Sequence, residues 1–169
     1  MDAEDVIFLR RSIRKYEPRA VPEEDITVLM RAAMAAPSAG NEQPWHFVVI
    51  RDRQILEAIP VFHPHAAMLK DASVAILICG DLTLEKYKGF WVQDCSAATQ
   101  NLLLAATARG LGTVWTAIYP IEDRVVGIRK LLHLPNHVIP LSLVPIGYPF
   151  EHPGRADRFR ADRVHHDQW

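Results

Sequence analysis

The sequence predicts an α/β or α+β sandwich, in which helices pack against a central sheet. Two observations indicate this fold class. Short β-branched or apolar runs, which are typical of buried strands, recur along the chain, and stretches with helical spacing of apolar residues lie between them. The chain has 169 residues, enough to bury roughly 70% of its unfolded surface, so we expect a single domain over residues 1–169.

The helices are indicated by apolar spacing and by the residues at their ends. After Pro22, Ile26 and Leu29 recur at helical spacing behind an acidic first turn, and Pro37 ends the pattern. A longer helix is expected over 89–112, where apolar groups surround much of the segment, so both of its faces should be covered. Shorter helices are expected at 2–9, 55–59, 65–72 and 121–134.

Four runs predict the strands of the sheet. The run SVAILIC is continuously apolar, which is typical of a buried strand. The last run contains Pro140 and Pro145, and because proline cannot donate to a strand ladder, we expect that strand to be bulged or near an edge. The expected strands are 46–50, 73–79, 113–118 and 138–149.

Composition and charge count against several classes of protein. The net charge of −1 gives no overall basic field that would draw nucleic acid or a membrane surface. No apolar run reaches the ~20 residues of a transmembrane helix, and Asp2, Glu4 and Asp5 stand where a signal peptide would be basic. Cys79 and Cys95 lie among apolar residues and are expected to be inert buried thiols. We therefore expect a cytoplasmic protein without nucleic-acid or membrane partners.

A basic cluster, RRSIR, follows the first expected helix. Its guanidinium groups and hydroxyl match what a phosphate dianion needs, namely forked cationic donors and a neutral donor. A solvated charge run is the alternative interpretation. A second arginine set lies in the charged segment 151–169, which is expected to be either a frayed tail or a docked arm with Phe159, Val164 and Trp169 as anchors. The candidates to meet one anion are Arg10, Arg11, Ser12 and Arg14 in the first set, and Arg155, Arg158, Arg160 and Arg163 in the second.

The segment APSAGNEQPWHF, residues 36–47, joins an expected helix to an expected strand. Its proline, serine, glycine and asparagine residues permit tight turns that expose backbone N–H groups. Such a loop suits hydrogen bonding to a planar heterocycle, with Trp45 as a wall. The alternative is an ordinary connection with Trp45 in the core.

Other motifs carry less information. The sequence has no GxGxxG after a strand, no P-loop, no GxSxG and no HExxH. The pairs His63/His65 and His165/His166 lack a recognisable metal-ligand spacing. We interpret them as solvated loop histidines, and we expect no metal site.

Together these segments resemble the nitroreductase family of FMN-dependent oxidoreductases, in its short-chain form. RRSIRKY resembles the family's opening phosphate motif, and APSAGNEQPWHFVVI resembles its most characteristic loop. QNLLLAATARGLGTVW resembles the central helix and the turn behind the flavin, and RADRFRADRVHHDQW resembles the basic closing arm. The four segments occur in family order and span nearly the whole chain.

The resemblance implies an α+β fold, a three-layer α/β sandwich with a central, mostly antiparallel sheet flanked by helices. It also implies a homodimer that holds two FMN molecules at the subunit interface, with the C-terminal arm, 151–169, exchanged between subunits. Around the phosphate, ribityl chain and pyrimidine edge, the matching positions are Arg10, Arg11, Ser12 and Arg14. In the loop that reaches the isoalloxazine, typically from the partner, they are Pro37, Ser38, Ala39 and Asn41, and near flavin N5 and the dimethylbenzene side they are Trp115, Thr116 and Ala117. Arg158 matches the late phosphate-binding position, with Arg155 and Arg160 as rivals, and His65 and Met68 are looser matches that line the pocket.

The implied reaction belongs to the cofactor, so no catalytic side chain is expected. A hydride from NAD(P)H reaches flavin N5 and passes to an electron-poor small molecule, such as a nitroaromatic or a quinone, in a ping-pong cycle. Hydride at N5 leaves negative charge over N1 and the C2 oxygen, where Arg14 is the candidate electrostatic stabiliser. A main-chain group near Thr116 is the candidate partner of N5. Gln100 and Asn101 need buried partners if the central helix lies in a dimer, and otherwise cap its solvent edge.

Two other functions stay open at this point. One is an FMN-binding protein that sequesters or breaks down flavin, or dehalogenates a substrate, as some relatives do; the extra lid segments usual in such relatives are absent from this sequence. The other is a non-enzymatic dimeric module that binds an anionic partner through its arginines, against which the net charge counts. No motif indicates the physiological acceptor or the choice between NADH and NADPH.

Overall fold

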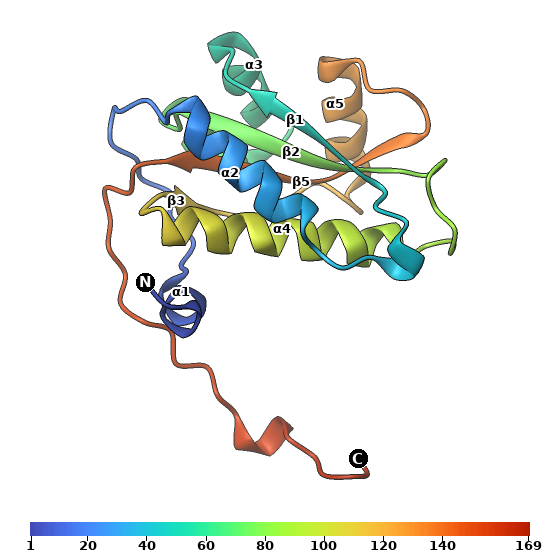
Figure 1. Ribbon diagram of the computed structural model, residues 1–169. Helices are drawn as coiled ribbons and strands as arrows, with labels where there is room; N and C mark the ends of the chain where they lie inside the picture. The colour runs from blue at the N-terminus through green and yellow to red at the C-terminus, as the bar shows by residue number, and fades with distance from the viewer.

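A computed structural model describes residues 1–169. Helices and short strands alternate along the chain (Figure 1). The α-helices are α1 (Ala3–Leu9), α2 (Glu23–Met34), α3 (Arg53–Ala58), α4 (Trp91–Ala108) and α5 (Glu122–Leu132). The strands are β1 (Trp45–Ile50), β2 (Val74–Asp81), β3 (Gly112–Thr113), β4 (Thr116–Ala117) and β5 (Val138–Gly147). Short 3₁₀ turns are η1 (Ala39–Asn41), η2 (Ile59–Val61), η3 (Pro64–Lys70) and η4 (Ala161–Arg163).

The strands pair antiparallel in the order β1-β2-β5-β3, and β4 also pairs with β5. In β2, Leu77 lies opposite Val48 of β1 on one side and Leu143 of β5 on the other. Every residue of β2 is buried, and a strand covered on both faces reads as a continuous apolar run. The order places β1 and β3 at opposite edges of the sheet.

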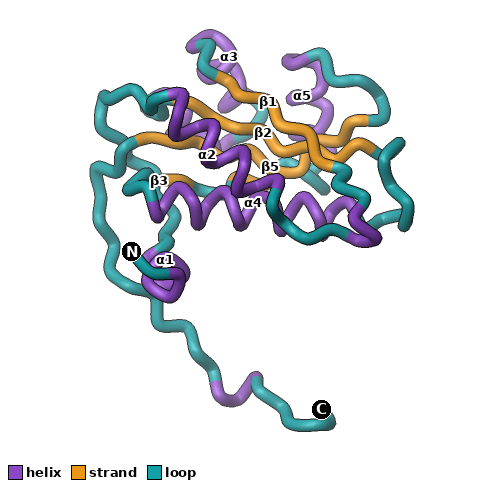
Figure 2. The backbone as a smooth tube through the Cα atoms, in the orientation of Figure 1, coloured by secondary structure: helices purple, strands orange, loops and turns teal.

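Helices cover both faces of the sheet, which gives three layers. Figures 1 and 2 show α2 and α4 on one face and α3 and α5 on the other. Side chains alternate along β2, so Ile76 and Ile78 enter the core beneath α2 and α4, whereas Ala75 and Leu77 enter the core beneath α3 and α5. The predicted three-layer α+β sandwich with an antiparallel sheet is confirmed.

The strand predicted over 113–118 is shorter and divided. β3 and β4 contain two residues each, and Val114 and Trp115 lie between them outside the ladder. Both short strands pair with β5, so the segment follows the same neighbour with one interruption. That interruption places Trp115 beside the hollow described below.

The expectation for the last strand is half correct. β5 lies inside the sheet, between β2 and β3, so the edge position is wrong. The bulge is confirmed, because the register between β2 and β5 shifts where Ile78 pairs with Ser142 and Cys79 pairs with Pro140. A proline without an N–H group is tolerated inside a sheet where the ladder is already irregular.

α4 is the longest helix, and Gly110, with φ of +70°, follows its C-terminal end. Asn101 of α4 donates from Nδ2 to the backbone oxygen of Ala32 in α2 at 3.1 Å, whereas Gln100 is exposed. Asn101 therefore ties the two helices together, and Gln100 lies at the solvent edge. None of the helices, α4 included, combines the length and apolarity needed to span a membrane.

Beyond β5 the chain leaves the sandwich as an extended arm (Figures 1 and 2). The arm, residues 151–169, contains only the short turn η4. It is fastened near its start, where the Ala156 N–H donates to the backbone oxygen of Phe8 at 3.1 Å. The expected anchors Phe159, Val164 and Trp169 are all exposed in the single chain.

Candidate functional site

The basic cluster lies along the edge of the sheet formed by β3. Ser12 forms an isolated parallel bridge with Thr113, and the Ile13 N–H donates to the backbone oxygen of Thr113 at 2.9 Å. Ile13 is buried, whereas its neighbours Ser12 and Arg14 are exposed, as alternation along an extended segment requires. The segment therefore presents Ser12 and Arg14 beside β3 and β4.

Arg14 borders a hollow of about 410 Å³. One wall of the hollow is β4 with the two residues before it, and another is the start of η3. Thr116 donates from Oγ1 to the backbone oxygen of Leu143 at 2.7 Å, and Arg124 donates from Nη1 to the backbone oxygen of Ala117 at 2.8 Å, so β4 is held from two sides. Six predicted site residues meet around this hollow, namely Arg14, His65, Met68, Trp115, Thr116 and Ala117.

His63 also lines this hollow, and the expectation of a solvated loop histidine is wrong for it. Its side chain is fully buried, and neither ring nitrogen has a hydrogen-bond partner. Burial, followed by the nearby charges of Arg124 and His65, lowers the pKa of His63 to about 4. The site therefore contains a neutral imidazole with hydrogen-bonding capacity to spare. The local motif HPH did not distinguish this buried histidine from its exposed neighbour His65.

The two arginine sets converge at the start of the arm. Burial, followed by the charges of Arg158 and Arg11, lowers the pKa of Arg10. The positive charge of Arg158 in the arm therefore acts on Arg10 in the first set. Arg11 donates from Nη1 to the backbone oxygen of Gly154 in the arm at 2.5 Å. Within a single chain, Arg11 is thus bonded to the arm, and Arg10 is influenced by the charge of Arg158 in the arm.

The three arm arginines that were rivals for this position differ in their partners. Arg155 pairs with Asp5 at 2.9 Å, and Arg160 pairs with Asp162 at 3.1 Å. Arg158 makes no ion pair within 4.0 Å. Of the three, only Arg158 keeps its charge free for an external anion.

The loop that contains Pro37, Ser38, Ala39 and Asn41 does not reach this hollow. It lies before β1, at the sheet edge opposite β3, and borders a separate hollow of about 330 Å³ against α4. Within one chain the structure therefore divides the predicted site into two parts. Trp45, at the end of the loop, is buried in the core beneath α2 and α4, so the core interpretation of this residue is correct.

The loop is held in a backbone conformation that suits few residues. Gly40 and Asn41 have φ of +52° and +54°, in the left-handed region. A Cβ atom added at Gly40 would lie 2.4 Å from the Tyr87 ring, so this position also needs glycine for space. The Ser38 hydroxyl oxygen accepts from the Gln43 N–H at 3.1 Å, which closes the loop on itself.

The model of the nitroreductase family matches residues 7–63 and 63–148, most of the chain. The chain belongs to the nitroreductase family. The resemblance predicted from the sequence is thus confirmed.

Similar nitroreductases match this chain over nearly its whole length. A protein of Methanothermobacter thermautotrophicus, provisionally named NADH dehydrogenase/NAD(P)H nitroreductase, is 59% identical over 100% of this chain and 88% of its own. A crystal structure from Parabacteroides distasonis with the same provisional name is 44% identical, with a TM-score of 0.95 over 98% of each chain. A protein of Desulfovibrio desulfuricans, provisionally described as a nitroreductase and solved in complex with FMN, is 27% identical, with a TM-score of 0.86 over 100% of this chain and 99% of that one.

The donor set of this nitroreductase fits the cofactor that its family implies. FMN has an anionic phosphate with about two charges at one end and a polar-edged ring at the other. The free cations Arg10 and Arg158 suit the first end, and the hollow bordered by Arg14 and the buried, unpartnered His63 suits the second. No group of three or more His, Cys, Asp or Glu side chains is placed to hold a metal ion.

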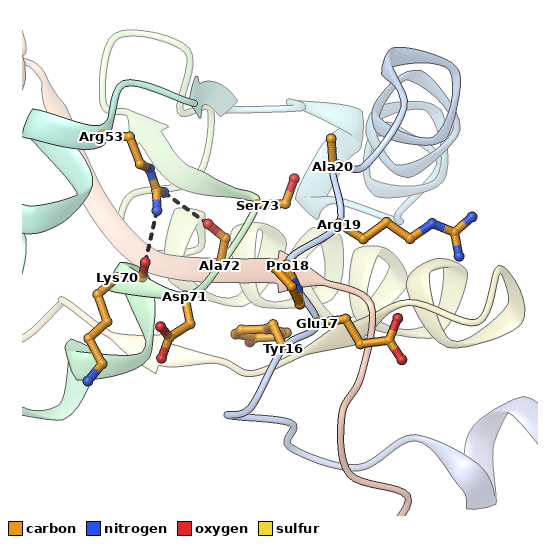
Figure 3. A pocket seen from close by; sticks show the side chains of 10 residues that line it. All are labelled: Tyr16, Glu17, Pro18, Arg19, Ala20, Arg53, Lys70, Asp71, Ala72 and Ser73. Carbon is orange, nitrogen blue, oxygen red and sulfur yellow. Dashed lines mark hydrogen bonds between the residues drawn. The ribbon is translucent and has the colours of Figure 1, made fainter.

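Another hollow, of about 530 Å³, lies away from the predicted residues (Figure 3). Arg53 points into it, but its guanidinium already donates to the backbone oxygens of Lys70 at 3.0 Å and Ala72 at 2.9 Å. Arg19 lies over the Tyr148 ring, 3.7 Å from its centroid. These cations are used within the fold, so this hollow is not the candidate site.

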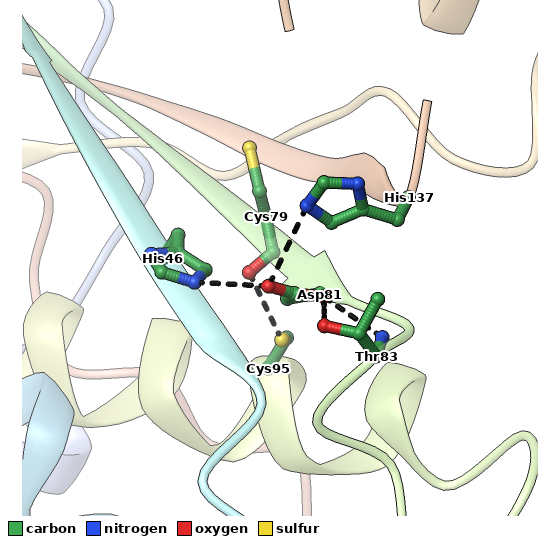
Figure 4. A network of polar contacts seen from close by, with 6 residues as sticks. All are labelled: His46, Cys79, Asp81, Thr83, Cys95 and His137. Atoms are coloured by element: carbon green, nitrogen blue, oxygen red, sulfur yellow. Dashed lines mark hydrogen bonds and ion pairs between the residues drawn. The ribbon is translucent and has the colours of Figure 1, made fainter. Parts of the chain in front are cut away.

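A polar network also closes the end of the sheet near the loop (Figure 4). Asp81, at the end of β2, accepts from the Thr83 hydroxyl at 2.6 Å and lies 3.3 Å from His46 and 3.9 Å from His137. Burial alone would raise the pKa of Asp81, but the bonds from Thr83 and the nearby His137 and His46 hold it below its usual value. The adjacent Cys79 and Cys95 are buried thiols whose pKa values are raised by burial, as expected of inert cysteines.

Proposed function

We propose that this protein is an FMN-dependent oxidoreductase that takes reducing equivalents from NAD(P)H and passes them to an electron-poor small molecule, such as a nitroaromatic or a quinone. Family membership and the names and bound FMN of its relatives support the proposal. The observation that carries it is that Arg10 and Arg11 meet the arm, through the charge of Arg158 and the bond to Gly154, in the same segment along the β3 edge from which Arg14 borders the hollow.

In this proposal the three converging arginines hold the phosphate. The charge of Arg158 contributes to the lowered pKa of Arg10, and neither arginine has a carboxylate partner within 4.0 Å, so a bound dianion would relieve a repulsion that acts on Arg10 without it. Arg11 is already oriented by its bond to Gly154. Charge at this end contributes binding free energy and leaves the ring free to react.

Arg14 and the backbone of β4 hold the ring in this proposal. When bound, FMN supplies the hydride chemistry between NAD(P)H and the acceptor in a ping-pong cycle. Arg14 stabilises the negative charge that reduction places on the pyrimidine edge, because its guanidinium is a permanent cation that borders the hollow. Backbone groups near Thr116 contact the reacting face, and Met68 supplies an apolar wall.

A second copy of the chain completes the site in this proposal. The outward face of α4 lines an apolar hollow of about 420 Å³ together with α1 and α2, among residues that include Val6, Ile7, Leu104 and Ala108. An uncovered apolar face of this kind is stabilised by a matching face of a second copy. In the homodimer, the loop 37–41 of one subunit reaches the ring held by the other, and the exposed arm residues Phe159 and Trp169 pack on the partner.

The test is a spectrum of the purified protein followed by an acceptor screen. We expect a yellow protein with about one FMN per chain, a dimer by light scattering, and NADH or NADPH oxidation that requires a nitroaromatic or quinone. A colourless protein that cannot be reconstituted with FMN would contradict the proposal. Bound FMN without NAD(P)H turnover would favour a flavin-sequestering or dehalogenating role, and salt-dependent binding of a polyanion without FMN would favour the anion-binding module.

A further inference from the structure

Two buried carboxyl groups lie directly behind the loop 37–41. Glu42 follows η1 and is 7% exposed, and Asp94 lies in the first turn of α4 and is 4% exposed. Figure 1 shows the turn before β1, which contains η1, beside the N-terminal end of α4. Neither residue is among the site residues predicted from the sequence.

These two carboxyl groups fasten the loop to the rest of the domain. Glu42 accepts through Oε2 from the backbone N–H groups of Lys86, at 2.6 Å, and Tyr87, at 3.1 Å. Asp94 accepts through Oδ1 from the N–H of Ala39 in the loop, at 3.0 Å. Lys86 adds a bond from Nζ to the backbone oxygen of Gly40 at 3.0 Å, so its ammonium group also fastens the loop.

The second oxygen of each carboxyl group has no donor. Glu42 Oε1 and Asp94 Oδ2 are both buried, and no N–H or O–H group reaches either of them. The two side chains lie within hydrogen-bonding reach of each other. Ionised carboxylates can only accept hydrogen bonds, so two ionised groups here would leave both oxygens unsatisfied and place two like charges in contact. One shared proton removes both problems, because one oxygen then donates to the other.

We propose that Asp94 carries this proton at neutral pH and donates it from Oδ2 to Oε1 of ionised Glu42, so that a protonated carboxyl pair positions the loop 37–41 for the cofactor. The proton belongs on Asp94 because the two backbone N–H bonds to Glu42 stabilise its ionised form, whereas Asp94 accepts only one. Glu42 and Asp94 are positioning residues. Their effect on the cofactor rests on the proposed function, whereas the proton itself does not.

The other buried carboxyl groups of the chain differ from this pair. Asp25 pairs with Arg109, and Asp81 has two histidines and Thr83. Burial, together with the contact from Glu42, raises the pKa of Asp94. Burial opposes the shift in Glu42, but the bonds from Lys86, Tyr87 and Asp94 lower its pKa. The charged and titratable groups that face the pair are Glu85, Lys86 and the thiol of Cys95.

The direction of the pH effect follows from the raised pKa of Asp94. A group whose pKa is higher in the folded state contributes stability that is complete below its unfolded pKa and is lost as pH rises through its folded pKa. Once Asp94 ionises, two like charges lie in contact and repel each other, which displaces the side chain that accepts from Ala39. Asp94→Asn should abolish this loss, since the amide donates to Glu42 and accepts from Ala39 without titrating.

The proton is tested first on the protein without cofactor. Infrared difference spectra between wild type and Asp94→Asn should show one buried, protonated carboxylic acid that the variant lacks. Unfolding of wild type should weaken with rising pH in a way that Asp94→Asn does not share. Asp123→Asn, an exposed acid in the first turn of α5, is the matched control and should behave as wild type. The absence of such a carboxylic acid band in wild type overturns the proposal, whether or not any variant folds.

The positioning role is tested by FMN affinity above pH 7, where the FMN phosphate, with a second pKa of about 6, is already dianionic. The FMN dissociation constant of wild type should rise with pH by at most about tenfold per unit, whereas that of Asp94→Asn should stay nearly constant. If the FMN dissociation constant changes with pH equally in wild type and Asp94→Asn, the positioning role is overturned. If no variant binds FMN, the proposed function has failed, and the infrared and unfolding results decide on the proton alone.

Discussion

The backbone N–H of Arg14 donates to Oε1 of Glu151 at 2.8 Å. This bond joins the residue that borders the ring-sized hollow to the first residue of the C-terminal arm. A second link, from Arg11 to Gly154, lies a few residues further along the arm. Two segments from opposite ends of the sequence therefore form one cationic surface inside a single chain, before any partner or cofactor is added.

The free charge of Arg158 predicts which arm arginine matters for the cofactor. Arg158→Ala should weaken FMN binding about tenfold or more, as expected for a lost charge-assisted contact of about 1.5–3 kcal/mol. Arg160→Ala is the matched control, because Arg160 is exposed and already paired with Asp162. FMN titrations by flavin fluorescence measure both. An equal loss in the two variants would show that the arm contributes only general charge.

The position of Arg14 predicts an effect on the redox potential of bound FMN. Arg14→Gln should make reduction harder, so the midpoint potential should become more negative, because a fixed cation beside the hollow is removed. Arg14→Lys keeps the charge without the planar fork and should lie between the two. Potentiometric titration of each loaded protein checks this. A potential that is the same in all three proteins would remove Arg14 from the ring end of the site.

The loop geometry predicts a stability cost at Gly40. Gly40→Ala should lower the free energy of unfolding by about 1–2 kcal/mol for the left-handed backbone alone, and further for the approach to Tyr87 at 2.4 Å. Gly89→Ala is the control, since Gly89 also has positive φ but nothing within 4 Å of the added Cβ atom. Urea unfolding measures both variants. Equal losses would mean that the Tyr87 contact costs nothing.

The network at Asp81 predicts acid sensitivity. The pKa of Asp81 is held below its usual value, so its contribution to stability is present above the unfolded pKa, about 3.9, and is lost as pH falls through the lower folded pKa. Asp81→Asn should be less stable than wild type at neutral pH by about 1–3 kcal/mol and should lose less on acidification. Thermal unfolding from neutral to acid pH measures the slope. If the stability of wild type and Asp81→Asn fell in parallel with pH, the assignment of this acid sensitivity to Asp81 would be contradicted.

Local sequence pattern was sufficient for the main elements of the fold. The continuous apolar run within Val74–Asp81 and the spacing of Ile26 and Leu29 depend only on neighbouring residues, so the buried strand and the helix were predictable. The position of β5 in the sheet was not predictable, because its prolines indicate irregularity without showing which strands flank it. The interruption at Trp115 depends on pairing with a strand far away in the sequence.

The residues of the candidate site were likewise predictable only in part. RRSIR carries its chemistry in adjacent residues, so Arg10, Arg11 and Arg14 could be selected from the sequence, and the choice of Arg158 needed the partners of its rivals. His63, Glu42 and Asp94 are important through burial and through contacts that span distant segments. No local pattern separates them from solvated residues of the same type.

An FMN titration of the double variant Arg10→Ala/Arg11→Ala measures whether the N-terminal arginines bind the phosphate of FMN. We expect saturable binding of about one FMN per chain by wild type and an affinity at least about tenfold lower in the double variant, with unchanged circular dichroism and dimer elution. Lys15 is an exposed cation of the same cluster, so Lys15→Ala should bind as wild type does. An unchanged affinity in the double variant, or no saturable binding by wild type, would show that these arginines do not bind the phosphate.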